Sequence, residues 1–218
     1  MGTFIIPEPT LRAVREAPAD CATVLLIRHS ARGPIPHGVP GNDVLLLPEG
    51  KALANELGRR IGGRLRTVHA SPVRRCVETA ESLVEGAEAD VVIVADCHLG
   101  HPGVYVEDGA EAWNTWQSLG HERVMGHLVA GDRLPGLTDP GPASRRLVTH
   151  MLGTAGGRPG VHVFVTHDSL VTTAAAHVLG VAFGKADWPQ YLEALVIVDS
   201  GAVATAAYRG RTGAVAWR

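Results

Sequence analysis

The chain has 218 residues, of which 45% are hydrophobic and 19% are charged, and its formal net charge at pH 7 is -2. This is enough apolar material for one domain with a substantial core, and the small net charge excludes a general nucleic-acid binder and a protein held to anionic membranes by its charge. No stretch approaches the ~20 apolar residues of a membrane helix, and prolines and charges interrupt the N-terminal residues, so neither a membrane span nor a signal peptide is expected.

The first half of the chain predicts alternating strands and helices. After an irregular N-terminal arm, the continuous apolar run 24–27 is typical of a buried parallel strand. A loop rich in proline and glycine follows, and then a helix is predicted over 48–61, started by a proline and ended by two glycines. A short strand at 67–70 leads to a second helix with Ser71 as its N-cap. The next element is a short buried strand at 91–94.

The second half opens with a long excursion, from about 96 to 142, that is rich in Gly, Pro, His and Trp. It has weak periodicity and predicts one or two short helices around 110–130; excursions of this kind are usually lids or caps. The later elements are a helix at 143–152, a strand at 161–165, a helix at 169–179 and strands at 192–198 and 202–207. This order predicts an α/β fold, a three-layer α/β/α sandwich with a mainly parallel sheet, formed by a single domain over 1–218 with a small cap insertion at 96–142.

The residues that follow the predicted strands carry most of the candidate chemistry. Ligands of open α/β sheets bind beyond the carboxyl ends of the strands. Three strand ends carry histidine, arginine or aspartate: Arg28, His29 and Arg32 after the first, Arg74 and Arg75 after the second, and His167 and Asp168 after the fourth. We therefore expect two histidines and several arginines to meet at one edge of the sheet.

Arg74 and Arg75 lie at a helix start, where the positive end of the macrodipole disfavours cations by ~0.3–1 kcal/mol each. Cations at this place favour an anion that binds between them and the helix N-terminus. Guanidinium groups suit a tetrahedral oxyanion such as phosphate. A histidine beside such arginines stays neutral, and neutral imidazole is a competent nucleophile toward phosphorus. The residues thus indicate phosphoryl transfer to His29.

No metal site or cofactor is predicted. Cys21, Cys76 and Cys97 are widely spaced without a CxxC pair, which favours reduced thiols in a cytoplasmic protein. His98 and His101 are separated by loop residues and no third ligand is evident, so we expect both to be surface or cap histidines.

Four segments resemble one known family. Residues 28–34, RHSARGP, resemble the RHGxRxP signature of the histidine phosphatase superfamily, which includes phosphoglycerate mutases and histidine acid phosphatases. Residues 71–80, SPVRRCVETA, are similar to its SPLxRCxxTA segment, and residues 47–50, LPEG, resemble its TPEG-type helix start. The pair at 167–168 resembles the HD pair of the acid-phosphatase branch. The resemblance extends over about 24–179 and implies a phosphoglycerate mutase-like fold.

The resemblance also implies an activity and site roles. A member of this family with these motifs hydrolyses a small-molecule phosphate monoester through a phosphohistidine, here on His29, and needs no metal. Arg28, Arg32 and Arg75 are implied to bind the phosphate, and His167 to contact the phosphoryl oxygens. By motif register Arg75 is the ligand, while Arg74 is expected in solvent. Arg145 and Arg146 are also expected on a solvated helix face.

The proton donor for the leaving group has two candidate sources. Asp168 is favoured, because His167 fixes it at a strand end; its alternative role is that of an N-cap alone. The mutase branch takes its acid from the segment after the third strand, where Glu107, Asp108 and Glu111 are available.

Three alternatives stay open on the sequence alone. Ser30 replaces the glycine of the signature and either crowds the turn or adds a hydroxyl to the pocket. Trp113 and Trp116 are expected to form a packed helix face, with contact to the leaving group if the segment is a lid. A mutase and a non-catalytic phospholigand sensor are the rival functions. The mutase motif RHGxSxxN differs from this chain, and the sensor is disfavoured because His29 and Arg75 are both present. Oligomeric state is not predicted.

Overall fold

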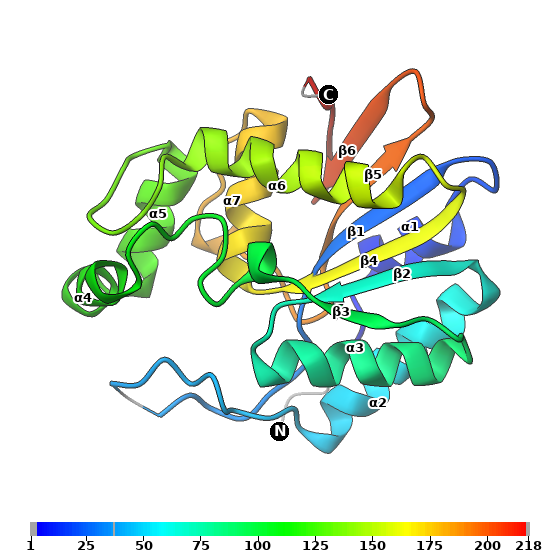
Figure 1. The fold of residues 1–218 in the computed structure, drawn as a ribbon, viewed down its shortest axis with the longest axis horizontal. Coiled ribbons are helices and arrows are strands. Elements are labelled where there is room, and N and C mark those ends of the chain that lie inside the picture. Colours follow the sequence, from blue (N-terminus) through cyan, green and yellow to red (C-terminus); the bar gives the residue numbers. More distant parts are fainter. Residues whose placement is uncertain (1–3, 37, 217–218) are drawn as a thin grey trace.

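The computed structural model of the chain describes residues 4–36 and 38–216. Its centre is a seven-stranded sheet in the order β3-β2-β4-β1-β5-β6-β7 (Figure 1). The strands are β1 (Ala22–Arg28), β2 (Leu65–Ala70), β3 (Ile93–Ala95), β4 (Gly160–Thr166), β5 (Ala194–Asp199), β6 (Ala204–Tyr208) and β7 (Arg211–Ala214). The strands β1 to β4 pair with one another in parallel, whereas β5 pairs antiparallel with β1 and with β6, and β6 pairs antiparallel with β7.

Helices cover both faces of this sheet, which confirms the predicted three-layer sandwich (Figure 1). One face packs against α1 (Glu8–Arg15), α2 (Pro48–Ile61) and α3 (Arg74–Ala87). The other packs against α6 (Pro140–Ala155) and α7 (Asp168–Leu179). The helices α4 (Gly109–Leu119) and α5 (His121–Ala130) lie beside the sheet, and three 3-10 helices complete the described elements: η1 (Gly62–Arg64), η2 (Cys97–Leu99) and η3 (Lys185–Asp187).

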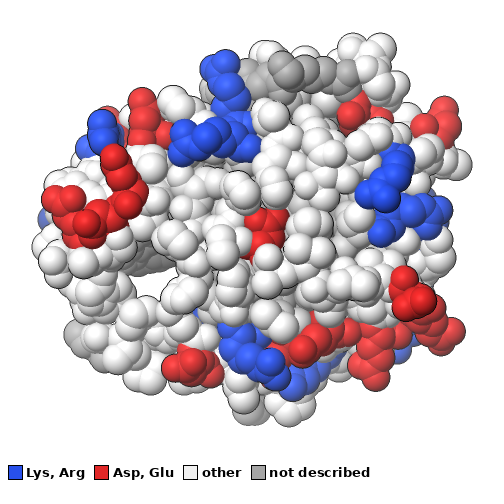
Figure 2. All heavy atoms as spheres, viewed as in Figure 1, with Lys and Arg blue, Asp and Glu red and all other residues white. Residues whose placement is uncertain are grey.

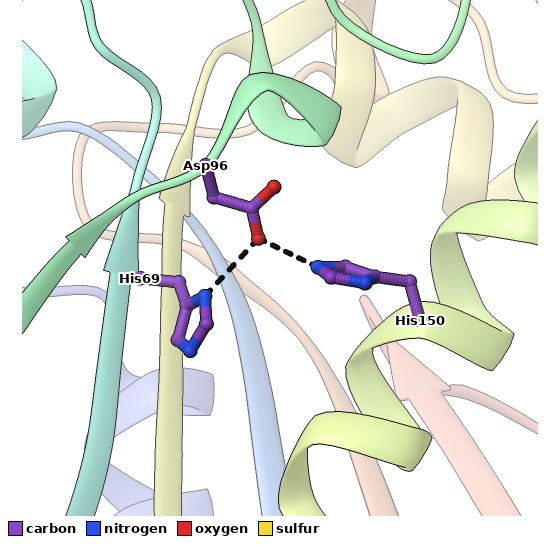
Figure 3. A group of neighbouring side chains, drawn as sticks. All are labelled: His69, Asp96 and His150. Atoms are coloured by element: carbon purple, nitrogen blue, oxygen red, sulfur yellow. Dashed lines mark hydrogen bonds and ion pairs between the residues drawn. The ribbon is translucent and has the colours of Figure 1, made fainter.

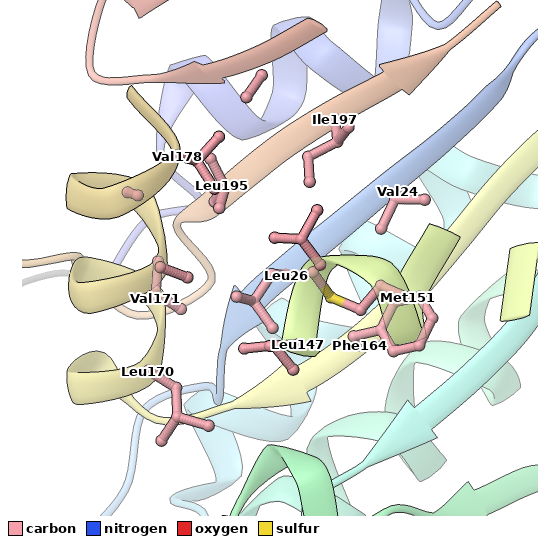
Figure 4. Close-up of a cluster of buried hydrophobic side chains, with 14 of the residues drawn as sticks. Val24, Leu26, Leu147, Met151, Phe164, Leu170, Val171, Val178, Leu195 and Ile197 are labelled. Atoms are coloured by element: carbon pink, nitrogen blue, oxygen red, sulfur yellow. The ribbon is translucent and has the colours of Figure 1, made fainter. Parts of the chain in front are cut away.

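Strand β1 is apolar at every central position because both of its faces are covered. Val24 and Leu26 pack toward α6 and α7, in the cluster drawn in Figure 4, while Leu25 and Ile27 pack toward α2 and α3. All four side chains are fully buried. A strand covered on both faces has no solvent side, so every position is apolar. This rigid centre holds the loop that follows Arg28.

The helices α4 and α5 have a small core of their own. Ala112 of α4 packs with Val124 and Leu128 of α5 and with Leu137 of the returning loop. Gly136 allows the return, because a Cβ there would lie 2.1 Å from the backbone nitrogen of Ala112. The part of the 96–142 segment that contains α4 and α5 therefore has a small core of its own, while Leu99, Tyr105 and Val129 of the same segment pack into the core of the main body.

Three sequence predictions for the fold are wrong. The N-terminal arm contains α1, because Thr10 and Val14 are buried against the main body and the Thr10 hydroxyl donates to the carbonyl of Leu192 at 2.9 Å. Residues 1–3 of that arm lie outside the described residues. The third strand is not buried: β3 is an edge strand paired only with β2, and Val94 is 42% exposed. The strand β7 was not predicted, since RTGA carries no apolar alternation.

The surface agrees with the charge argument from the sequence. In Figure 2, Lys and Arg alternate with Asp and Glu around the described part of the face shown, without a broad basic area. No helix among the described residues is both long and apolar enough to cross a membrane.

Candidate active site

The ends of three parallel strands meet at one edge of the sheet, as predicted. His29 continues β1, and its backbone N–H donates to the carbonyl of Thr166 in β4 at 2.8 Å. Ser71 continues β2 and donates to the carbonyl of Val165 at 2.9 Å. The rings of His29 and His167 lie 5.7 Å apart between centroids. Backbone hydrogen bonds thus fix the position of both histidines.

His29 is held in one tautomer with a free basic nitrogen. Its side chain is buried, and its Nδ1 donates to the carbonyl of Ser30 at 2.8 Å. The Nε2 therefore carries no proton and accepts from Nε of Arg75 at 3.1 Å. Burial, His167 and Arg75 hold the pKa of His29 well below its ordinary value. Near neutral pH the ring is therefore neutral, with its lone pair on Nε2.

Arg75 connects the two histidines. Its Nη2 donates to Nδ1 of His167 at 3.2 Å, and its Nη1 donates to the carbonyl of Gly41 at 2.7 Å. Because arginine stays protonated, Nδ1 of His167 is the acceptor. The guanidinium is buried and fixed in the first turn of α3, whereas Arg74 is exposed, as the motif register predicts.

His167 completes the network and corrects the prediction for Ser71. Nε2 of His167 donates to the Ser71 hydroxyl at 3.1 Å, and α3 begins at Arg74 with Val73 in the N-cap position. Ser71 is therefore a partner of His167, not a helix cap. Burial and the charge of Arg75 lower the pKa of His167 to about 3.

Arg28 and Arg32 flank the histidines and each keeps an unused donor. Arg28 donates to the carbonyl of Pro189 at 2.7 Å and lies over the ring of Tyr191 at 4.5 Å. Arg32 donates to the carbonyl of Gly33 at 2.7 Å. The Nε atoms of both arginines are buried without a hydrogen-bond partner. An unsatisfied buried donor costs free energy, so each of these arginines has a donor that its protein partners leave unused.

Asp168 lies against Arg28 as well as at the start of α7. One carboxylate oxygen is 3.2 Å from Nη2 of Arg28 and 3.9 Å from Nε2 of His121, and the other accepts from the N–H of Ser169 at 2.9 Å. His167 occupies the N-cap position, so Asp168 is the first helical residue. Burial raises the pKa of Asp168, but the charges of Arg28, His121 and His167 and the hydrogen bond from Ser169 together outweigh burial and lower it.

The other candidate acids lie elsewhere. Glu107 is exposed and pairs with Arg133 at 2.8 Å, and Asp108 is the N-cap of α4. Glu111 is exposed and borders the same shallow depression as Glu107 and Asp108. None of the three borders the cavity that contains His29 and Asp168.

Ser30 neither crowds the turn nor enters the pocket. Its side chain is fully buried, its hydroxyl donates to the carbonyl of Gly50 at 2.7 Å, and its N–H donates to the Thr79 hydroxyl at 3.0 Å. Thr79 in turn donates to the carbonyl of Arg75 at 2.7 Å. Ser30 thus ties the loop after His29 to both α2 and α3.

The histidines open into a cavity of about 950 Å³ between the sheet edge and the 96–142 segment. Its lining is mostly apolar: Ile35, Val39, Val73, Tyr105, Val106, Trp113, Trp116, Leu128, Leu137 and Leu170. Trp116 also packs against the small core of α4 and α5, as predicted for a helix face. Of the described lining residues, Arg32 and Arg75 are the only Lys or Arg, and Asp168 is the only acid.

Several contributors were missed from the sequence. The ring of Tyr191 lies beside that of His29, tilted, with centroids 5.8 Å apart; the carbonyl of Gly41 accepts from Arg75, and His121 faces Asp168. No local motif marks them, because each reaches the site through the tertiary fold.

Other predictions hold: His101 borders the cavity and is exposed, Arg145 and Arg146 are exposed, and all three cysteines are free.

Comparison with known proteins gives both a family and a fold. The model of the histidine phosphatase superfamily (branch 1) matches residues 24–201. A phosphoglycerate mutase from Bacillus anthracis str. Sterne has a TM-score of 0.56 at 15% identity, over 90% of this chain and 96% of that one. Phosphoserine phosphatase from Entamoeba histolytica, in complex with 3-phosphoglyceric acid, has a TM-score of 0.56 at 16% identity, over 90% and 96%. YhfR from Bacillus stearothermophilus has a TM-score of 0.59 at 18% identity, over 88% of this chain and 98% of that one. No curated protein matches the sequence.

Proposed function

The chain belongs to the histidine phosphatase superfamily, and on this basis we propose that it hydrolyses phosphate monoesters in two steps through a phosphohistidine on His29. The observation that carries the proposal is the geometry at Nε2 of His29. This atom is unprotonated, buried and 3.1 Å from a guanidinium that also contacts His167. Phosphoryl transfer needs both a neutral nucleophile, which attacks phosphorus, and a fixed positive charge, which stabilises the group in transfer.

In the first step the Nε2 lone pair attacks phosphorus and the ester P–O bond breaks. The phosphoryl oxygens are bound by Arg28, Arg32, Arg75 and His167. The leaving oxygen takes a proton from the carboxyl group of Asp168 and departs as an alcohol. The guanidinium groups spread the charge of the group in transfer, and each is anchored by one donor to a backbone carbonyl. The hydrogen bond from Nε of Arg75 to Nε2 of His29 opens so that the lone pair can attack.

In the second step water attacks the phosphohistidine. The Asp168 carboxylate takes a proton from that water, the P–N bond breaks, and inorganic phosphate leaves with neutral His29 restored. No metal ion takes part in either step.

Asp168 has to be protonated for the first step, although Arg28 lowers its pKa in the free protein. A bound phosphate shares Arg28 and adds negative charge beside the carboxylate. Like charge disfavours ionisation, so substrate binding raises the pKa of Asp168. The rival proton donors are Glu107, Asp108 and Glu111, but none of them lines the cavity.

The lining of the cavity suggests the class of leaving alcohol. We propose that the 96–142 segment is a cap insertion within a single domain, and that its Trp113 and Trp116 contact the substrate. Two of the lining residues are arginines, and both are assigned to the phosphate, which leaves none for a carboxylate on the alcohol. A bulky, uncharged and largely apolar alcohol fits this lining better than phosphoserine or a phosphoglycerate.

The test is phosphate release from para-nitrophenyl phosphate between pH 4 and 8, with EDTA present. We expect activity in the wild type and in the control His127→Ala, which changes an exposed histidine of α5, and none in His29→Ala. A mutase would return the phosphoryl group to a hydroxyl and release little phosphate. A sensor would be stabilised by phosphate without turnover. Equal activity in His29→Ala and the wild type would refute the mechanism.

A further inference from the structure

A second group of histidines lies outside the cavity, around one buried carboxylate. His69 lies on β2, Asp96 follows β3 and His150 lies on α6, and all three side chains point toward one another (Figure 3). One carboxylate oxygen of Asp96 is 3.1 Å from Nδ1 of His69 and 2.6 Å from Nε2 of His150. None of these residues borders the cavity that contains His29.

A third imidazole joins from η2. The other oxygen of Asp96 is 2.9 Å from Nδ1 of His98 and accepts from the His98 backbone N–H at 2.9 Å. The ring of His98 stacks on that of His150 with centroids 4.0 Å apart. We call His69, Asp96, His98 and His150 the histidine–aspartate cluster.

The charge of Asp96 is compensated differently from that of the other buried acids. Among the described residues, buried Glu78 pairs with Lys51 at 2.9 Å and buried Glu193 pairs with Arg209 at 2.8 Å. Within the described part of the chain, the ion-pair partners of Asp96 are histidines alone. A buried carboxylate needs a cation, and neutral imidazoles supply none unless they take up protons or share a metal ion.

We infer that the histidine–aspartate cluster binds one divalent transition-metal ion, with Zn²⁺ as the best fit. Imidazole nitrogens and a carboxylate are ligands that Zn²⁺ prefers, and Co²⁺ and Ni²⁺ accept the same set. The ligand atoms of His69, Asp96 and His150 lie within 4.8 Å of one another. Tetrahedral zinc with ligands at 2.0–2.1 Å needs separations of about 3.3 Å, which small side-chain rotations provide.

The surroundings of the cluster suit a structural site with access from solvent. The side chain of Asp96 is 4% exposed and that of His69 13%, whereas His98 is 51% exposed and opens the cluster to water. The ring of His69 is held by stacking on Phe164, with centroids 5.1 Å apart. A bound ion would join β2, the end of β3, η2 and α6. It would therefore stabilise the fold where the 96–142 segment leaves the sheet.

The experiment uses the full chain stripped with a chelator and then titrated with Zn²⁺ or Co²⁺. Melting temperature and calorimetry report binding, and the visible d–d absorption of Co²⁺ reports nitrogen and oxygen ligation. We expect one ion per chain, a higher melting temperature, and a loss of affinity of about tenfold or more in His150→Ala and Asp96→Asn. His150→Ala is the safer variant, because alanine favours the helix α6.

The control is His127→Ala, which breaks an exposed pair of one histidine and one aspartate, 2.9 Å apart, outside the cluster. This variant should bind the ion like the wild type. Binding that persists in His150→Ala and Asp96→Asn but disappears in His29→Ala would place the ion in the cavity and overturn the inference. So would a melting temperature of the folded wild type that neither Zn²⁺ nor Co²⁺ changes.

Discussion

The protein holds two groups of histidines whose neighbours are of opposite charge. The pair of His29 and His167 lies among arginines, and burial with those charges lowers the pKa of both rings. The histidine–aspartate cluster surrounds a carboxylate, whose pKa is lowered because the hydrogen bonds from His69, His150 and His98 together outweigh its burial. Only two positions separate the groups on β2, where His69 belongs to the cluster and Ser71 binds His167.

The difference shows that the neighbours of an imidazole, more than the residue itself, determine its ligand. Arginines keep the first pair neutral and add positive charge, so this pair suits an anion and offers a nucleophile to it. A carboxylate at the centre of the second group gives it negative charge, so it suits a cation. Substitutions that remove these neighbours, or the imidazoles themselves, test the comparison.

After the complete loss of activity expected for His29→Ala, the largest expected effect is that of Asp168→Asn. Loss of a general acid typically lowers kcat ~10²–10⁴-fold, and the loss should be greatest for alkyl phosphates, whose leaving oxygen needs the proton most. Para-nitrophenyl phosphate should lose much less. The rate of each substrate in single-turnover assays gives the comparison. Glu107→Gln should leave all rates unchanged. A larger loss of rate in Glu107→Gln than in Asp168→Asn would show that Asp168 is not the proton donor.

Arg75→Gln removes the charge that connects His29 with His167. We expect kcat/KM to fall ~10²–10³-fold, which corresponds to about 3–4 kcal/mol of transition-state stabilisation. Stabilisation of the folded protein by inorganic phosphate should also disappear in thermal melts. Arg74→Gln is the matched control, since Arg74 is the exposed neighbour. Similar losses in both variants would contradict the assignment of Arg75 as the phosphate ligand.

The two groups should also differ in how they link stability to pH. His29 and His167 have folded pKa values below the ordinary 6.5, so the unfolded chain binds more protons below that pH and stability falls as the pH drops. The slope is at most ~1.4 kcal/mol per pH unit for each histidine. Asp96, with a lowered pKa, keeps its contribution until the pH falls below about 4.

Urea unfolding of the wild type and His167→Gln at pH 7, 6, 5 and 4.5, in buffer without phosphate, measures this difference. The variant should show a smaller decrease in unfolding free energy across the series. If the two curves run parallel, His167 is not held neutral in the folded protein.

The smallest effect concerns the leaving group. Trp113→Ala removes apolar surface from the cavity, so KM for naphthyl phosphate should rise several-fold, which corresponds to about 1–2 kcal/mol. The KM for glycerol 2-phosphate should change little. Val92→Ala, on an exposed side chain far from the cavity lining, is the control. Equal changes for both substrates would mean that Trp113 acts through folding instead of contact.

The strand ends were predictable because their signals are local. A covered strand is apolar throughout, and the residue after it lies at the sheet edge whatever the loops do, so His29, Arg75 and His167 follow from chain order. The resemblance added the register that distinguishes buried Arg75 from exposed Arg74. The single-domain boundary and the role of the 96–142 segment remain proposals.

The parts that the sequence did not reveal depend on distant contacts. His150 lies 54 positions from Asp96, and neither residue has a spacing that marks a ligand pair. His98 is exposed, as predicted, but its contact with Asp96 was not foreseen. The helix α1 depends on packing against the main body, and Tyr191 reaches His29 from a loop near the start of β5. Burial and long-range pairing of this kind have no local periodicity.

The central claim is that the phosphoryl group passes through His29, and trapping the intermediate tests it most directly. The protein is mixed with a ³²P-labelled monoester, quenched in alkali within the first turnover, digested and analysed by mass spectrometry. The account predicts an alkali-stable, acid-labile label on the peptide that contains His29, and no label in His29→Ala. A label on another residue, or phosphate release by His29→Ala at the rate of the wild type, would contradict it.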